Sequence, residues 1–94
     1  MFRIELDQRP DLLVMKIEGQ LKGEYAEHTR TVMTCCDPAL KVLVDLREVT
    51  YVDTTGEEVL SFLARLGAKF EADNPYTLHL CERLRLPLTR TKSN

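Results

Sequence analysis

The sequence predicts an α/β fold with a four-stranded, mostly parallel, mixed sheet and helices packed on it. Segments with apolar residues at every second position alternate with segments in which they recur every three or four, in the order β-β-α-β-α-β-α. Leu, Ile, Val and Phe exceed the roughly 20% below which chains stay disordered, and the net charge is only −2. A chain of 94 residues has room for one core, so we expect residues 1–94 to form a single domain with its core over residues 2–86.

The first two strands are predicted from alternation of side chains. Over residues 2–6 apolar residues alternate with charged ones, and over residues 12–19 one face carries Leu13, Met15 and Ile17 while the other carries Lys16 and Glu18. Between them, Arg-Pro-Asp at residues 9–11 is typical of a turn, so the two strands are expected to form a hairpin. Residues 19–23 are expected to connect this hairpin to a helix.

The middle of the chain predicts a helix and then a central strand. The helix is expected to follow Gly23 and to end at Asp37-Pro38, with an apolar face made of Tyr25, Thr29, Val32 and Cys36. Residues 40–46, LKVLVDL, are nearly all aliphatic, which is typical of a strand buried on both faces. A short loop is expected next, carrying Val49, Tyr51 and Val52.

A second helix is predicted to begin at Asp-Thr-Thr-Gly, residues 53–56, and to end at Gly67. Two capping boxes are possible there, because Glu57 follows Thr54 by three residues and Glu58 follows Thr55 likewise. The apolar face of this helix is expected to carry Val59, Leu60, Leu63 and Leu66.

The last strand is expected at residues 68–72, followed by a third helix. Asn74-Pro75 is typical of a helix N-cap and first helical residue, with Tyr76, Leu80 and Leu84 on one face. A strand remains the alternative, since Tyr76, Leu78 and Leu80 also alternate. Residues 87–94 are expected to be flexible.

Composition argues against several classes of function. The chain has no Trp, 6% aromatic residues and a slightly negative charge, which disfavours nucleic-acid binding. Its four glycines form no phosphate-binding loop, so no nucleotide cofactor is expected. No apolar run approaches the roughly 20 residues that span a bilayer, so no membrane association is expected. Three cysteines, two of them adjacent, indicate reduced thiols in a cytoplasm and lack the paired spacing of a metal site.

The densest chemistry lies between residues 42 and 63. An aliphatic strand ends in Asp45-Leu46, and after Val49 and Val52-Asp53 the residues Thr54-Thr55-Gly56 open a helix. A hydroxyl at a helix N-terminus is exposed, and the free backbone N–H groups there partly satisfy an added phosphate. The carboxylates nearby oppose such a phosphate, and they belong to Asp53, Glu57 and Glu58.

This segment resembles the STAS domain, which bacterial anti-sigma factor antagonists share with the cytoplasmic tails of sulfate transporters. The resemblance extends over residues 2–86 and includes Gly67-Ala68 and Pro75. It implies a bacterial protein-binding switch without catalysis of its own, whose partner is an anti-sigma factor that is also a serine-kinase-like protein. In anti-sigma factor antagonists that partner phosphorylates the first hydroxyl after the motif aspartate, so the resemblance implies Thr54 as the modified residue here, with Thr55 as second choice. The partner-binding surface would then comprise Asp53, Thr54, Thr55, Gly56 and Glu57.

Two departures from the family pattern bear on that function. Threonine replaces the commoner serine, and Glu57 stands where the family usually has a leucine-like residue. Residues 45–58 carry a net charge of −4, so a complementary partner would be basic there. Three alternatives remain open: Thr54 and Thr55 serve only as helix caps, the domain builds a homodimer or larger assembly, or it binds a small ligand or nucleotide.

Overall fold

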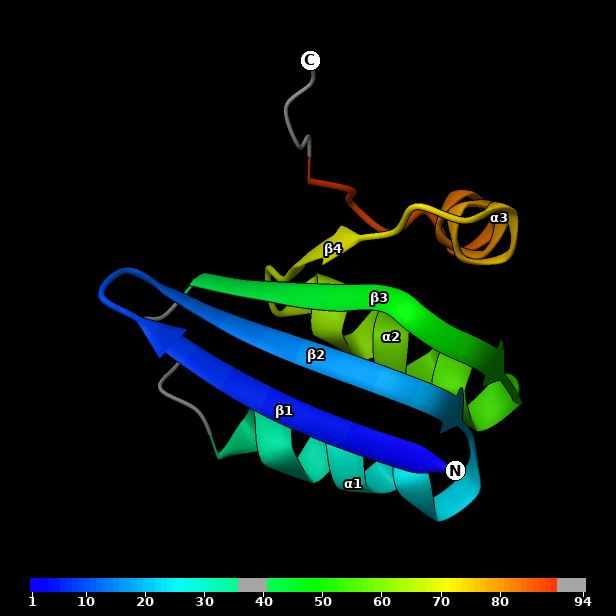
Figure 1. The fold of residues 1–94 in the computed structure, drawn as a ribbon, viewed down its shortest axis with the longest axis horizontal. Helices are drawn as coiled ribbons and strands as arrows, with labels where there is room; N and C mark the ends of the chain where they lie inside the picture. The colour runs from blue at the N-terminus through cyan, green and yellow to red at the C-terminus, as the bar shows by residue number, and fades with distance from the viewer. Residues whose placement is uncertain (36–40, 90–94) are drawn as a thin grey trace.

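The computed structural model describes residues 1–35 and 41–89, and its element order is the predicted β-β-α-β-α-β-α (Figure 1). Within that part of the chain, four strands form one mixed sheet in the order β1-β2-β3-β4. β1 (Phe2–Arg9) and β2 (Leu12–Leu21) form the predicted antiparallel hairpin. β2 pairs in parallel with β3 (Lys41–Val52), which pairs in parallel with β4 (Lys69–Glu71). The aliphatic third strand is therefore central, as predicted.

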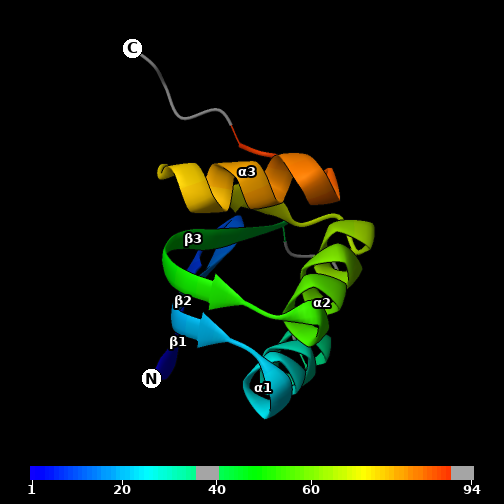
Figure 2. The same cartoon turned by 90° about the vertical axis from the view of Figure 1, so that its right-hand side faces the viewer.

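The helices cover one face and one edge of this sheet. α1 (Gly23–Thr34) and α2 (Thr54–Arg65) lie side by side on the same face, and α3 (Pro75–Leu84) lies beyond the β3–β4 edge (Figure 2). Within the described residues, no helix covers the opposite face. The apolar core therefore lies between the sheet and the pair α1 and α2, and its fully buried large side chains include Met15, Ile17, Leu21, Val44, Leu46, Leu60, Leu63, Phe70 and Leu80.

Three strands are longer than predicted, and the first of them, β1, continues past Leu6 to Arg9. β2 continues to Leu21 and β3 to Val52, where the sequence indicated a connection and a loop. Irregularities in the β2–β3 ladder shift the register between Lys16 and Glu18 and again after Gly19. Because bulges change which side chains face the core, burial along the end of β3 recurs at every third residue, at Leu46, Val49 and Val52.

The predicted apolar face of α1 is correct at Thr29, which is buried, and at Val32, which packs partly buried against the core, but it is wrong at Tyr25. The buried residues are Ala26, Thr29 and Met33, whereas Tyr25 is 39% exposed. The ring of Tyr25 stacks on Phe2 of β1 with centroids 4.9 Å apart, so it packs at the rim of the core. The predicted end of this helix, from Cys36 to Pro38, lies outside the described residues.

The predicted end of α2 and the predicted start of α3 are confirmed, with a change in which side chains are buried. Gly67 follows α2 with a left-handed φ of +99°, as its C′ position requires. Leu66 is the C-cap of α2 and is exposed, although it was expected in the core. The helical interpretation of α3 is correct: the side chain of Asn74 accepts a hydrogen bond from the Thr77 amide at 2.9 Å. The buried residues of α3 are Thr77, Leu80 and Cys81.

The segment after α3 pairs with the sheet as far as Thr89, although flexibility was predicted from residue 87. The Phe70 amide donates to the Pro87 carbonyl, and the Thr89 amide donates to the Phe70 carbonyl, each at 2.8 Å. Leu88 thus forms a parallel bridge with Phe70 along the outer edge of β4. Residues 90–94 lie outside the described part.

Candidate functional site

Asp53 holds the N-termini of two helices together. It is the N-cap of α2, and its Oδ1 accepts a hydrogen bond from the Gly56 amide at 2.8 Å. Its Oδ2 accepts from the amide of Gly23, the first residue of α1, at 3.1 Å. The N-cap of α1, Lys22, makes no side-chain cap bond, so Asp53 supplies that acceptor. The two capping boxes considered from the sequence are not formed, because the N-cap is Asp53, one residue before Thr54 and two before Thr55.

Gly56 is buried where α2 approaches the end of β2. A Cβ atom added to it would lie 2.3 Å from the Leu21 carbonyl oxygen and 2.7 Å from Cγ1 of Val52. This glycine is therefore required by a close approach of backbone to backbone, while its own φ is helical. The tight entry into α2 predicted from the sequence has this steric cause.

Thr54 is the first residue of α2 and its side chain is exposed, whereas Thr55 is half-buried. Among the described residues, no side-chain hydrogen bond involves either hydroxyl. The first N–H groups of an α-helix have no intrahelical acceptor, so the amides of Thr54 and Thr55 add positive potential beside these hydroxyls. Of the two, Thr54 offers the more accessible oxygen to a modifying enzyme.

Glu57 forms an ion pair with α3. Its carboxylate accepts from the guanidinium of Arg83, with Nη2 2.5 Å from Oε2. The hydrogen bond and the charge of Glu57 raise the pKa of Arg83 above its usual value. Two of the three carboxylates around Thr54 are therefore engaged within the chain, Asp53 by amides and Glu57 by Arg83. Glu58 is exposed, and its carboxylate would repel a phosphate on Thr54.

The N-terminal end of α3 is attached to the end of β3 that leads into this site. The Val52 amide donates to the hydroxyl of Tyr76 at 2.8 Å, and the side chain of Asn74 donates to the Arg47 carbonyl at 3.3 Å. Tyr76 and Arg83 thus support the Thr54 region, and sequence reasoning missed both. They lie 24 and 26 residues from the groups they bind, and no local pattern links residues so far apart.

A groove of about 420 Å³ runs along α2 from Thr54. Its walls come from all three helices, and the guanidinium of Arg30 in α1 lies over the ring of Phe62, 5.0 Å from its centroid. The charged residues that line it are of both signs, which suits a polar partner surface better than an apolar ligand. The lining residues are Glu27, Arg30, Thr54, Glu57, Glu58, Val59, Ser61, Phe62, Arg65 and Leu84.

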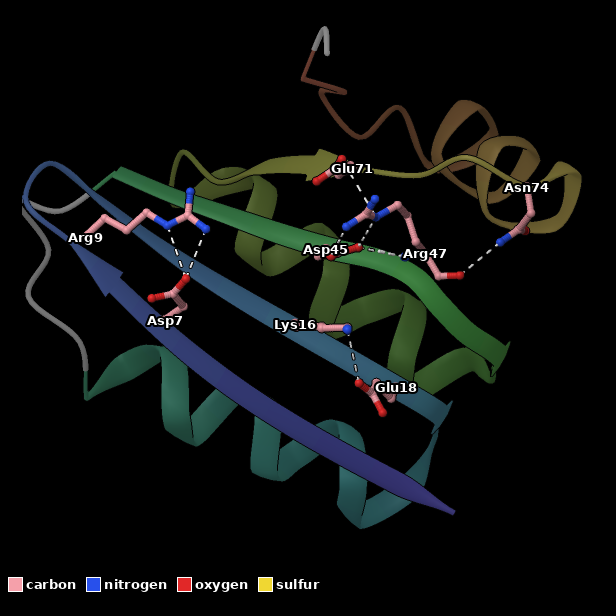
Figure 3. Close-up of polar contacts among 8 residues, drawn as sticks. All are labelled: Asp7, Arg9, Lys16, Glu18, Asp45, Arg47, Glu71 and Asn74. Atoms are coloured by element: carbon pink, nitrogen blue, oxygen red, sulfur yellow. Dashed lines mark hydrogen bonds and ion pairs between the residues drawn. The ribbon is translucent and has the colours of Figure 1, made fainter. Parts of the chain in front are cut away.

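Asp45, the first acidic residue of the motif, lies on the open face of the sheet (Figure 3). It is buried, and Arg47 binds it with Nε at 3.1 Å, Nη2 at 3.0 Å and its backbone amide at 3.0 Å. Burial by itself raises the pKa of Asp45, but these bonds and the charges of Arg47 and Lys16 outweigh it and hold the pKa below its usual value. Arg47 also pairs with Glu71 at 3.8 Å, so Asp45 stabilises the β3–β4 junction.

The remaining candidate groups do not join this site. His28 and His79 are exposed on helices, and Cys35 is an exposed free thiol. Cys81 is a buried free thiol, and burial raises its pKa to about 11. Over residues 1–35 and 41–89, no three His, Cys, Asp or Glu side chains gather as metal ligands. No helix in the same part has the length and apolar character to cross a membrane.

Among the known proteins compared with this chain, only solved structures match it. No family model matches the sequence, and no curated protein matches it. The solved structure of the anti-sigma factor antagonist SpoIIAA in its unphosphorylated form matches with a TM-score of 0.72, over 99% of this chain and 90% of that chain, at 14% identity. The chain has a SpoIIAA-like STAS fold.

Two further structures with this SpoIIAA-like fold are similar. An anti-sigma factor antagonist from Mycobacterium paratuberculosis matches with a TM-score of 0.77 over 97% of this chain and 87% of that chain, at 16% identity. An uncharacterised DUF3478-family protein from Shewanella loihica matches with a TM-score of 0.57 over 93% and 81%, at 14% identity. At these identities the comparison establishes the fold, and function has to be argued from the site.

Proposed function

We propose that this chain is a regulatory protein-binding module of the anti-sigma factor antagonist type, acting in the cytoplasm and without catalysis of its own. Its partner is an anti-sigma factor with serine-kinase-like activity that docks at the start of α2. The observation that carries the proposal is Thr54, an exposed hydroxyl without a side-chain hydrogen bond among the described residues, at the first position of α2. The SpoIIAA-like fold supports it.

Phosphorylation of Thr54 is the proposed switch. The Thr54 oxygen forms a bond to the γ-phosphorus of a nucleoside triphosphate, the hydroxyl proton is released, and the nucleoside diphosphate leaves. The product carries about 1.5–2 negative charges beside Glu58. A docked partner would desolvate that group next to a like charge, so the modified form binds it less well.

A constitutive assembly module is the second candidate, and one observation favours it. Among the described strands, β1 has no neighbour on its outer edge. Leu6 in that strand and Tyr25, which stacks on Phe2 beside it, are both exposed. An unpaired edge with apolar neighbours is the kind of surface on which a second copy pairs.

The experiment that separates these functions uses the parent chain with Thr54→Ala and Thr55→Ala variants, each tagged and expressed in the source organism. Phosphopeptide mass spectrometry is expected to find a phosphate on Thr54 in the parent and in Thr55→Ala, and none in Thr54→Ala. The co-purified partner is expected to contain a kinase-type ATP-binding domain. If Thr54 is unmodified and all three proteins bind the same partners, the phosphorylation switch is refuted. The constitutive assembly module then remains as the function.

A further inference from the structure

The ion pair between Glu57 and Arg83 connects the proposed phosphorylation position to α3. Among the ion pairs of residues 1–35 and 41–89, it is the one that joins two helices. The Arg83 side chain is 49% exposed and that of Glu57 is 26% exposed. A pair as open to water as this contributes little to stability, so a stronger acceptor nearby can displace Glu57.

Thr54 is placed to carry that acceptor. Thr54 and Glu57 are three residues apart on α2, and side chains at this spacing lie on the same face with Cβ atoms about 5–6 Å apart. Both line the same groove, to which α3 contributes Leu84, the residue after Arg83. The guanidinium that reaches Glu57 is therefore within a side-chain rotation of a phosphate on Thr54.

The charges favour an exchange of partners. A phosphothreonine carries about 1.5–2 negative charges and three acceptor oxygens, against one charge on Glu57. Bonds from arginine to phosphate are charge-assisted and frequently bidentate. The other charged groups that line the groove are Glu27 and Arg30 from α1 and Glu58 and Arg65 from α2. Two of them are acidic and two basic, so they do not decide the exchange.

We propose, as a step that rests on the phosphorylation above, that Arg83 is the intramolecular acceptor of a phosphate on Thr54. In the unmodified chain Arg83 holds Glu57, and in the modified chain it leaves Glu57 and pairs with the phosphothreonine. The N-terminal end of α3 stays attached through the bond between Tyr76 and Val52. The exchange therefore releases the carboxylate of Glu57 to solvent and changes the surface between α2 and α3 at the docking site.

The test installs phosphothreonine at position 54 by genetic encoding and follows the phosphorus NMR signal against pH. The second pKa of a phosphothreonine is about 6, and pairing with Arg83 is expected to lower it by about half a unit to one unit. Arg83→Gln is expected to abolish that shift. Glu57→Gln is expected to increase it, because the competing carboxylate is gone. Arg85→Gln, also exposed and two residues further on, is the matched control and should leave the pKa as in the parent.

An equal phosphate pKa in the parent and in Arg83→Gln would overturn the proposal, as would an equal change in Arg85→Gln. Urea unfolding confirms that each variant folds, and Arg83 lies at the surface, so loss of the fold is not expected. Because the phosphate is encoded, this result does not depend on a kinase. Absence of phosphate on Thr54 in cells would refute the proposed function alone, and an unshifted pKa would refute the exchange alone.

Discussion

At the scale of single residues, the position of the candidate site depends on a glycine, Gly56, because a side chain there would not fit. Gly56 lets the first turn of α2 pass close to the Leu21 carbonyl and the Val52 side chain. Gly56→Ala is expected to destabilise the fold by about 3 kcal/mol, at the upper end for overpacking, because one of the clashing atoms is backbone that cannot rotate away. The free energy of unfolding in urea measures this change.

Gly23→Ala is the matched control for that substitution. Gly23 also stands at the start of a helix, but a Cβ there meets nothing within 4 Å. Its φ of +51° makes alanine cost about 1 kcal/mol through backbone strain alone. If Gly56→Ala were no more destabilising than Gly23→Ala, the close approach to Leu21 would not be what requires this glycine.

Some residues of the site could be predicted from the sequence and others could not. Asp53, Thr54 and Gly56 stand together, and the helix start they form follows from local rules of capping. Tyr76 and Arg83 reach the same region from α3, and their contacts depend on how α3 crosses the sheet edge. Pairing over such separations is a property of tertiary packing, which residue spacing alone does not report.

At the scale of elements, one carboxylate couples α1 to α2. Asp53→Ala removes the acceptor of the Gly56 amide and that of the Gly23 amide together. We expect a loss of about 2 kcal/mol, the upper end for a single helix cap, because two helix starts lose an acceptor. Urea unfolding followed by circular dichroism measures it.

Asp53→Asn is the control for that loss. Asparagine keeps one oxygen acceptor for the cap of α2 and replaces the other oxygen with a donor, which cannot serve the Gly23 amide. It should therefore lose less stability than Asp53→Ala. Hydrogen exchange should then show faster opening at the start of α1 than at the start of α2. Equal protection of both helix starts would contradict the double role of Asp53.

The elements that were predicted are those with regular periodicity. β1 and α2 have unbroken apolar repeats, and their starts were predicted correctly at Phe2 and near Asp53. The end of β3 was not predicted, because the register shifts bury Val49 and Val52 three residues apart, whereas side chains on one face of a regular strand recur at every second residue. In α1, Thr29 was predicted correctly, but small Ala26 is buried where the larger Tyr25 was expected.

At the scale of the whole molecule, one edge of the sheet is covered and the other has no neighbouring strand among the described residues. Pro87–Thr89 pairs with β4 and α3 lies beside it, so that edge is covered. On the other side, β1 has no neighbouring strand among the described residues. A second copy that pairs with β1 would therefore use the edge of the sheet opposite β4.

The last prediction concerns the whole fold, because Cys81 is buried where α3 meets the core. Burial raises its thiol pKa to about 11, against 9.0 for an exposed cysteine. A pKa that is higher in the folded state gives stability that is fully present below about pH 9 and is lost as pH rises through about 11. Cys81→Ala removes this dependence.

The comparison is made in a Cys35→Ser, Cys36→Ser background to prevent oxidation. At pH 7 the parent should be more stable than Cys81→Ala, because the variant leaves a cavity in the core. From pH 9 to pH 11 that difference in unfolding free energy should shrink by about 2 kcal/mol, as measured in urea at each pH. A difference that stays constant to pH 11 would mean that Cys81 ionises without unfolding, and hence that α3 opens to water independently of the rest of the core.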